Sequence, residues 1–151
     1  MFEQLIRRLT APAPTRLPDA DARLALAALM VRVAKADGTY AVAEIARIDR
    51  ILQRRFALDQ VAAASLRAGA EVLEHQAPDT VRFTRAIKDA VAYDDRAAVV
   101  EALWEVALAD EGRAADEDAL LRLIAPMLGL TDQDSALIRR RVEAGKGMRN
   151  P

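Results

Sequence analysis

The residues whose types and spacing suggest chemistry are two aspartates and two glutamates in a repeated arrangement. The same spacing separates the members of each pair, Asp37 with Glu44 and Asp110 with Glu117. Hard divalent cations such as calcium and magnesium prefer several oxygen ligands. If the two segments meet in space, their carboxylates provide such a set. The sequence therefore indicates four candidate metal ligands: Asp37, Glu44, Asp110 and Glu117.

The same carboxylates also have a purely structural interpretation. Each glutamate falls in the expected first turn of a helix, where a carboxylate offsets the helix dipole by about 0.3–1 kcal/mol. Ala41 and Ala114 occupy the expected cap positions three residues earlier, so a capping box would be only half present. The segment that starts at Asp37 does not have the regularly spaced acidic ligands of an EF-hand loop. The pattern alone leaves a structural role and metal binding as alternatives.

Apolar residues on both sides of the acidic pairs recur at helical spacing and match between the two copies. The matching pairs are Leu26 and Val99, Met30 and Leu103, Val33 and Val106, Ile48 and Leu121, and Ile51 and Ile124. This joint spacing predicts an internal duplication of one helix–loop–helix hairpin. Gly38 follows its aspartate directly, whereas Gly112 comes one place later. Two copies are too few for a solenoid and suit a pseudo-symmetric helical bundle.

The chain as a whole predicts an all-α fold, a single-domain bundle of about seven helices. Frequent alanine and the lack of alternating apolar runs favour helices over strands. We expect a short N-terminal helix with a Pro-rich linker (1–18), a helical domain (19–145) and a frayed tail (146–151). Asp59 and Thr131 are expected to begin helices, and Gly129 to end one. The helix after Asp59 is expected to turn four residues inward: Val61, Leu66, Val72 and Leu73.

Composition and residue counts argue against several classes of function. The net charge of −1 gives no general attraction to nucleic acid, and the absence of cysteine removes thiolate zinc sites. His75 is the single histidine, and neither Ser65 nor Ser135 stands in a nucleophile elbow. No apolar run is long enough to cross a bilayer, and the N-terminus does not resemble a signal peptide. We expect a soluble, cytoplasmic, non-enzymatic protein without a nucleic-acid partner.

Several features bear on partners. Residues 32–55 carry six basic and three acidic residues, whereas 101–118 carry seven acidic residues and one basic. This segregation favours a protein partner, unless the two halves neutralise each other inside the bundle. Arg139–Arg141 and the amphipathic segment Met1–Leu9 could contact an anionic membrane, although a solvated face and packing on the bundle are favoured. Trp104 is expected at the edge of the core. The sequence does not determine the oligomeric state.

The two acidic segments resemble the paired signature of the TerB-like family, tellurite resistance protein TerB. The residues that carry the resemblance are Ala36-Asp37-Gly38 with Glu44, and Ala109-Asp110 with Gly112 and Glu117. It extends from about Leu24 to Arg140, and the displaced Gly112 departs from the pattern. The resemblance implies an all-helical duplicated fold, a metal-binding acidic surface and an association with tellurite resistance and chemical stress. We therefore expect a non-enzymatic accessory protein with calcium or magnesium as its only candidate cofactor. The alternative is a metal-free protein–protein interaction module.

Overall fold

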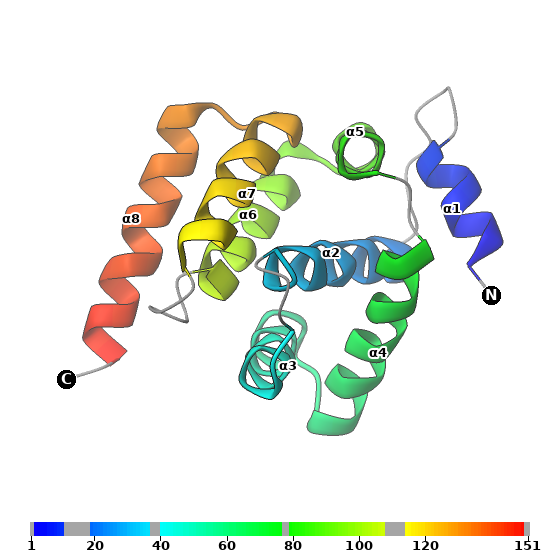
Figure 1. Ribbon diagram of the computed structural model, residues 1–151, viewed down its shortest axis with the longest axis horizontal. Helices are drawn as coiled ribbons and strands as arrows, with labels where there is room; N and C mark the ends of the chain where they lie inside the picture. The colour runs from blue at the N-terminus through cyan, green and yellow to red at the C-terminus, as the bar shows by residue number, and fades with distance from the viewer. Residues whose placement is uncertain (1, 11–18, 37–39, 77–78, 108–113, 150–151) are drawn as a thin grey trace.

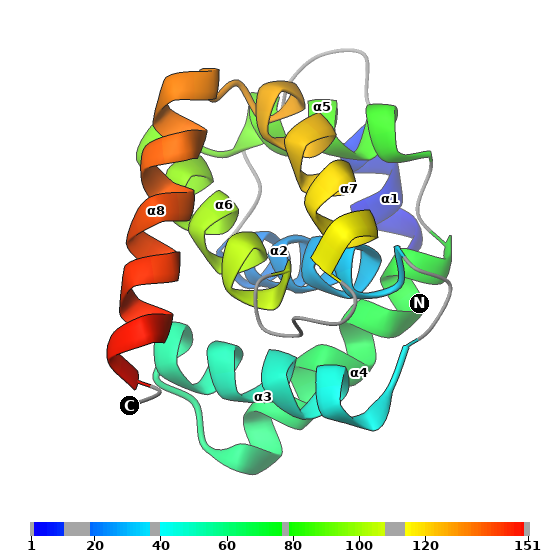
Figure 2. The same cartoon turned by 60° about the vertical axis from the view of Figure 1, so that its left-hand side comes forward.

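The computed structural model describes residues 2–10, 19–36, 40–76, 79–107 and 114–149, and these residues form helices joined by short connections. The helices of this part of the chain are α1 (Glu3–Thr10), α2 (Asp19–Ala34), α3 (Val42–Phe56), α4 (Gln60–Gln76), α5 (Thr80–Ala90), α6 (Tyr93–Ala107), α7 (Ala114–Met127) and α8 (Asp132–Arg149). No strand occurs among the described residues, so the predicted all-α class is confirmed. Figures 1 and 2 show α2 in the middle of the bundle, with α1 and α8 at opposite ends.

The central helix is α2, on which α3, α4, α6 and α7 all pack. The sequence predicted one apolar stripe, but α2 is buried on nearly every side. A helix that is apolar all round belongs in the middle of a bundle, and alanine lets its neighbours approach closely. Its buried residues are Ala25, Ala27, Ala28, Leu29, Met30, Val31, Val33 and Ala34.

The inward face of α4 differs from the prediction. Leu73 is buried as expected, but Val61 is 80% exposed and Val72 43% exposed. Small residues line the buried face instead, and they fall at helical spacing with the leucines: Ala63, Leu66, Ala70 and Leu73. Alanines on this face allow α4 to lie close against α2. The prediction considered only large apolar residues and therefore missed them.

Both predicted helix starts with polar caps are confirmed. The Asp59 carboxylate accepts a hydrogen bond from the Ala62 amide at 2.7 Å at the start of α4. The Thr131 hydroxyl accepts one from the Asp134 amide at 3.0 Å at the start of α8. The Asp134 carboxylate accepts a hydrogen bond from the Tyr93 hydroxyl at 2.5 Å, which ties α6 to α8.

The end of α7 at Gly129 is also confirmed, and the structure explains why glycine is needed there. Gly129 has a φ of 85°, which disfavours residues with a Cβ. A Cβ at this position would also meet the end of the Arg96 side chain, which would have to shift. That guanidinium donates a hydrogen bond to the Leu128 carbonyl at 2.6 Å. The Leu130 amide donates to the Ala125 carbonyl at 3.1 Å and closes the helix end.

The two ends of the chain are attached to the bundle. Leu5 is buried, and α1 packs on α5. α8 continues to Arg149, into the segment 146–151 for which a frayed tail is predicted. Extending an existing helix adds one hydrogen bond for each residue fixed, so the glycines near this end do not stop it. Within the described residues, no helix combines the length and the apolar character needed to span a membrane.

Candidate functional site

The structure describes the four predicted ligands unequally. Asp37 and Asp110 lie outside the described residues. Glu117 lies in the first turn of α7, where its side chain is not among those described. Glu44 lies in the first turn of α3 and is 3% exposed. The described residues contain no group of three or more histidine, aspartate or glutamate side chains placed to hold a metal ion.

Glu44 differs from an ordinary acidic residue at a helix start because it is buried. Its amide donates to the Ala41 carbonyl at 3.0 Å, and Ala41 has the extended conformation of a cap residue but no side chain to cap with. A carboxylate that only offsets the helix dipole can do so from the surface. Burying it costs free energy unless other groups compensate for the lost water. Glu44 is therefore the one predicted ligand for which the structure describes a buried side chain.

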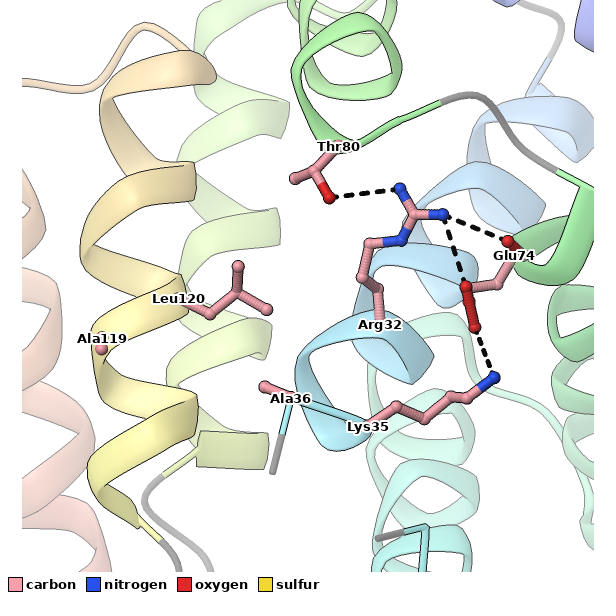
Figure 3. A pocket seen from close by; sticks show the side chains of 7 residues that line it. All are labelled: Arg32, Lys35, Ala36, Glu74, Thr80, Ala119 and Leu120. Atoms are coloured by element: carbon pink, nitrogen blue, oxygen red, sulfur yellow. Dashed lines mark hydrogen bonds and ion pairs between the residues drawn. The ribbon is translucent and has the colours of Figure 1, made fainter. Parts of the chain in front are cut away.

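A cavity of about 470 Å³ lies where the end of α2 faces α7 (Figure 3). Ala36 immediately precedes Asp37, and Ala119 follows Glu117 by two residues. Figure 3 shows Ala36 and Leu120 extending into this space from opposite sides. The structure thus brings the start of one predicted acidic segment and the first turns of α7 to a single cavity.

The charged residues of this cavity pair with one another. Arg32 donates to the Glu74 carboxylate at 3.3 Å, to the Glu74 carbonyl at 3.1 Å and to the Thr80 hydroxyl at 3.4 Å. Lys35 Nζ lies 2.7 Å from the other carboxylate oxygen of Glu74. Among the described side chains of this cavity, one carboxylate thus faces two basic groups. A metal ion near this cavity would need several carboxylates from the neighbouring segments to overcome that charge.

A second cavity, of about 440 Å³, shares Lys35 with the first and is bordered by Tyr40, Glu71 and His75. Burial raises the pKa of the Tyr40 phenol above its ordinary value of 10.0, and the nearby Glu71 carboxylate raises that pKa further. Tyr40 is therefore a neutral phenol at neutral pH. It stands at the start of the chain segment that leads into α3 and Glu44.

Glu71 is held in place by an ion-pair cluster between α3 and α4. Arg67 Nε and Nη2 lie 2.8 and 3.3 Å from the two carboxylate oxygens of Asp49, and Nη1 lies 3.0 Å from Glu71. Hydrogen bonding to Asp49 raises the pKa of Arg67, so the guanidinium stays charged. Sequence reasoning missed this cluster. The four-residue spacing of Arg67 and Glu71 on one helix was the available signal, and nothing in the sequence pointed to Asp49.

A second set of ion pairs links α3 to α6. Arg55 Nη2 lies 2.6 Å from Glu105 and 3.5 Å from Glu101, and Arg54 also pairs with Glu105. These residues come from the basic and acidic segments that the sequence analysis contrasted. At these positions the two segments neutralise each other within the bundle, which reduces the charge offered to a partner.

The described residues form an all-helical bundle in which one pair of helices, α2 and α3, packs against another, α6 and α7. Residues 23–140 match the family model described as Tellurite resistance protein TerB, and the chain belongs to the TerB family. Comparison with curated proteins and with solved structures gives no match. The internal duplication stays a prediction, because matched burial such as that of Met30 and Leu103 is expected of any two core helices.

Proposed function

We propose that this chain is a non-enzymatic accessory protein of a tellurite or chemical-stress response that holds a divalent cation. The ligands are the four carboxylates of Asp37, Glu44, Asp110 and Glu117. The observation that carries the proposal is the shared cavity, which Ala36 and Ala119 border from two different hairpins. Membership of the TerB family supports the stress context.

The burial of Glu44 gives further support. A buried carboxylate is costly, and a bound cation would offset part of that cost. An all-oxygen ligand set suits calcium or magnesium, with water molecules completing the coordination shell. The absence of cysteine and the presence of a single histidine, His75, disfavour a soft-metal site.

Thermal unfolding of chelator-treated protein with added calcium or magnesium tests this proposal. A cation that binds only the folded state at a hundred times its Kd stabilises it by about 2.7 kcal/mol. For a chain of this size we expect Tm to rise by roughly 5–10 °C. The double variant Asp37→Asn, Asp110→Asn should lose the rise. The matched control Asp89→Asn, Asp132→Asn changes two exposed aspartates of α5 and α8 and should keep it. A ligand-site variant that keeps the full rise removes these residues from the site.

The alternative function, a metal-free interaction module, is favoured by one surface. On α8, Leu137 is 56% exposed and Arg140 and Arg141 are exposed, whereas Ile138 on the opposite side is buried. An exposed apolar residue beside exposed basic side chains suits an acidic protein partner. The immobilised chain should then recover a partner that the variant Leu137→Glu does not recover. Recovery of nothing above background by a monomeric chain counts against this function.

A further inference from the structure

A third cavity lies near the opposite end of α2 from Ala36, between α2, α3 and α6, which all pack on one another. Its volume is about 290 Å³. An apolar cavity of about 150 Å³ is large enough to hold benzene, so this one has room for a molecule of two fused rings. A protein partner would bury far more area than a hollow of this size offers. The cavity therefore suits a small molecule.

The walls of this cavity extend from the surface of the bundle to its core. Arg23, Asp95 and Ala98 border it and are exposed, so the cavity opens to solvent on their side. Its other walls include buried apolar residues of all three helices: Met30, Leu52, Val99 and Ala102. Water in such a hollow finds few polar partners, and an apolar molecule that displaces it removes apolar surface from water.

The charges that border this cavity balance one another. Arg23 and Asp95 bring one charge of each sign. Arg55 also lines the cavity, but its Nη2 lies 2.6 Å from Glu105 and 3.5 Å from Glu101, so its charge is compensated within the bundle. A charged ligand would lose water here and meet no excess of opposite charge among the described residues of the walls. A neutral ligand avoids this cost.

We propose that this cavity binds a neutral, predominantly apolar small molecule about the size of two fused rings. Met30 and Phe56 are both among its walls. A thioether and an aromatic ring make favourable contacts with an aromatic ligand, which favours a ring system over a branched aliphatic molecule. This site goes beyond the cation site proposed above and does not depend on it.

The direct test compares three naphthalene derivatives with the substituent at the same ring position: naphthalenemethanol, naphthoate and naphthylmethylamine. Each is titrated calorimetrically into the full chain at neutral pH, where the first is neutral, the second anionic and the third cationic. We expect the alcohol to bind saturably at one molecule per chain, and each charged probe to bind roughly tenfold more weakly. No binding of the alcohol overturns the proposal, and so does a charged probe that binds as tightly as the alcohol.

Two variants locate the binding. Ala98→Leu places a larger side chain at the open edge of the cavity, without repacking the core, and should weaken the alcohol by roughly tenfold or more. Circular dichroism confirms that this variant is folded. The matched control Ser65→Leu enlarges an exposed residue of α4 that borders a different apolar cavity, and it should leave the affinity unchanged. An affinity that Ala98→Leu does not change, or that Ser65→Leu lowers as much, places the probe elsewhere and contradicts the proposal.

Discussion

The two halves of the bundle are held together by different interactions. In the first half, the α3–α4 and α2–α4 contacts include the ion pairs of Arg67 with Asp49 and of Arg32 with Glu74. In the second half, α8 packs on α6 around Trp104, which is 2% exposed and more deeply buried than the predicted core-edge position. Apolar burial contributes more free energy than partly exposed ion pairs. Because α2 of the first half is also buried on nearly every side, we infer that apolar packing stabilises both halves, and that the first half differs by adding ion pairs that position the side chains around the cavities.

The largest expected effect is that of Trp104→Ala. Its indole N–H donates to Ser135 at 3.4 Å, and the Arg139 guanidinium lies 5.0 Å from the ring centroid. Removing a buried aromatic side chain leaves a cavity and costs about 3–5 kcal/mol. Urea unfolding measures the loss, and Trp104→Phe should cost clearly less. A loss below about 1 kcal/mol for Trp104→Ala would contradict a stabilising role for the packing of α8 on α6 around this side chain.

The variant Arg67→Met tests the ion pairs between α3 and α4, in the first half of the bundle. It leaves the carboxylates of Asp49 and Glu71 partly buried without their shared guanidinium, and a lost hydrogen bond to a charged group costs about 1.5–3 kcal/mol. The control Arg50→Met removes an exposed arginine of the same bundle and should change stability by less than about 0.5 kcal/mol. Equal unfolding free energies for the two variants would mean that the cluster does not stabilise the α3–α4 contact.

The variant Gly129→Ala tests the contribution of the end of α7, in the second half of the bundle, to stability. The left-handed backbone opposes a residue with a Cβ, and we expect a loss of about 1–2 kcal/mol. Gly145→Ala is the matched control with the opposite sign. It lies within α8 with no atom within 4 Å of a new Cβ, so it should gain about 0.5–1 kcal/mol. Thermal unfolding of both variants distinguishes a glycine that is required from one that is not.

The smallest effect concerns the pH dependence of stability. Because burial raises the pKa of Tyr40 in the folded state, the unfolded chain loses this proton first as the pH rises past 10. The free energy of unfolding should therefore fall above pH 10, and less steeply in Tyr40→Phe than in the parent. Hydrogen bonding to Asp134 also raises the pKa of Tyr93, so both proteins should carry Tyr93→Phe. Parallel profiles would contradict the burial of the Tyr40 hydroxyl.

Much of the fold could be predicted because local signals determine helix boundaries. Asp59 and Thr131 each cap the first turn of a helix, and Gly129 ends one with a positive φ. These roles are the ones that their residue types indicate. Burial was harder to predict. Val61 lies two residues before Ala63 and therefore on the opposite side of α4 from its buried face, which alanines rather than only large residues form.

Burial and contacts between helices were also hard to predict at the candidate sites. The spacing of Glu44 after Asp37 was visible in the sequence, but the burial of Glu44 was not. Ion pairs between helices, such as that of Arg67 with Asp49, join residues at separations that no sequence period singles out. The cavity that Arg32 and Glu74 border likewise depends on how helices distant in the sequence meet. Such contacts follow from tertiary packing, which short-range patterns do not encode.

The central claim, a cation held by the repeated acidic residues, is tested most directly by calorimetric titration of calcium, magnesium, manganese and zinc into chelator-treated protein. The account predicts a saturable signal near one or two ions per chain for at least one of the hard cations, and its loss in Glu44→Gln, Glu117→Gln. The absence of any signal at millimolar metal would contradict it and leave the repeated carboxylates as elements of the fold.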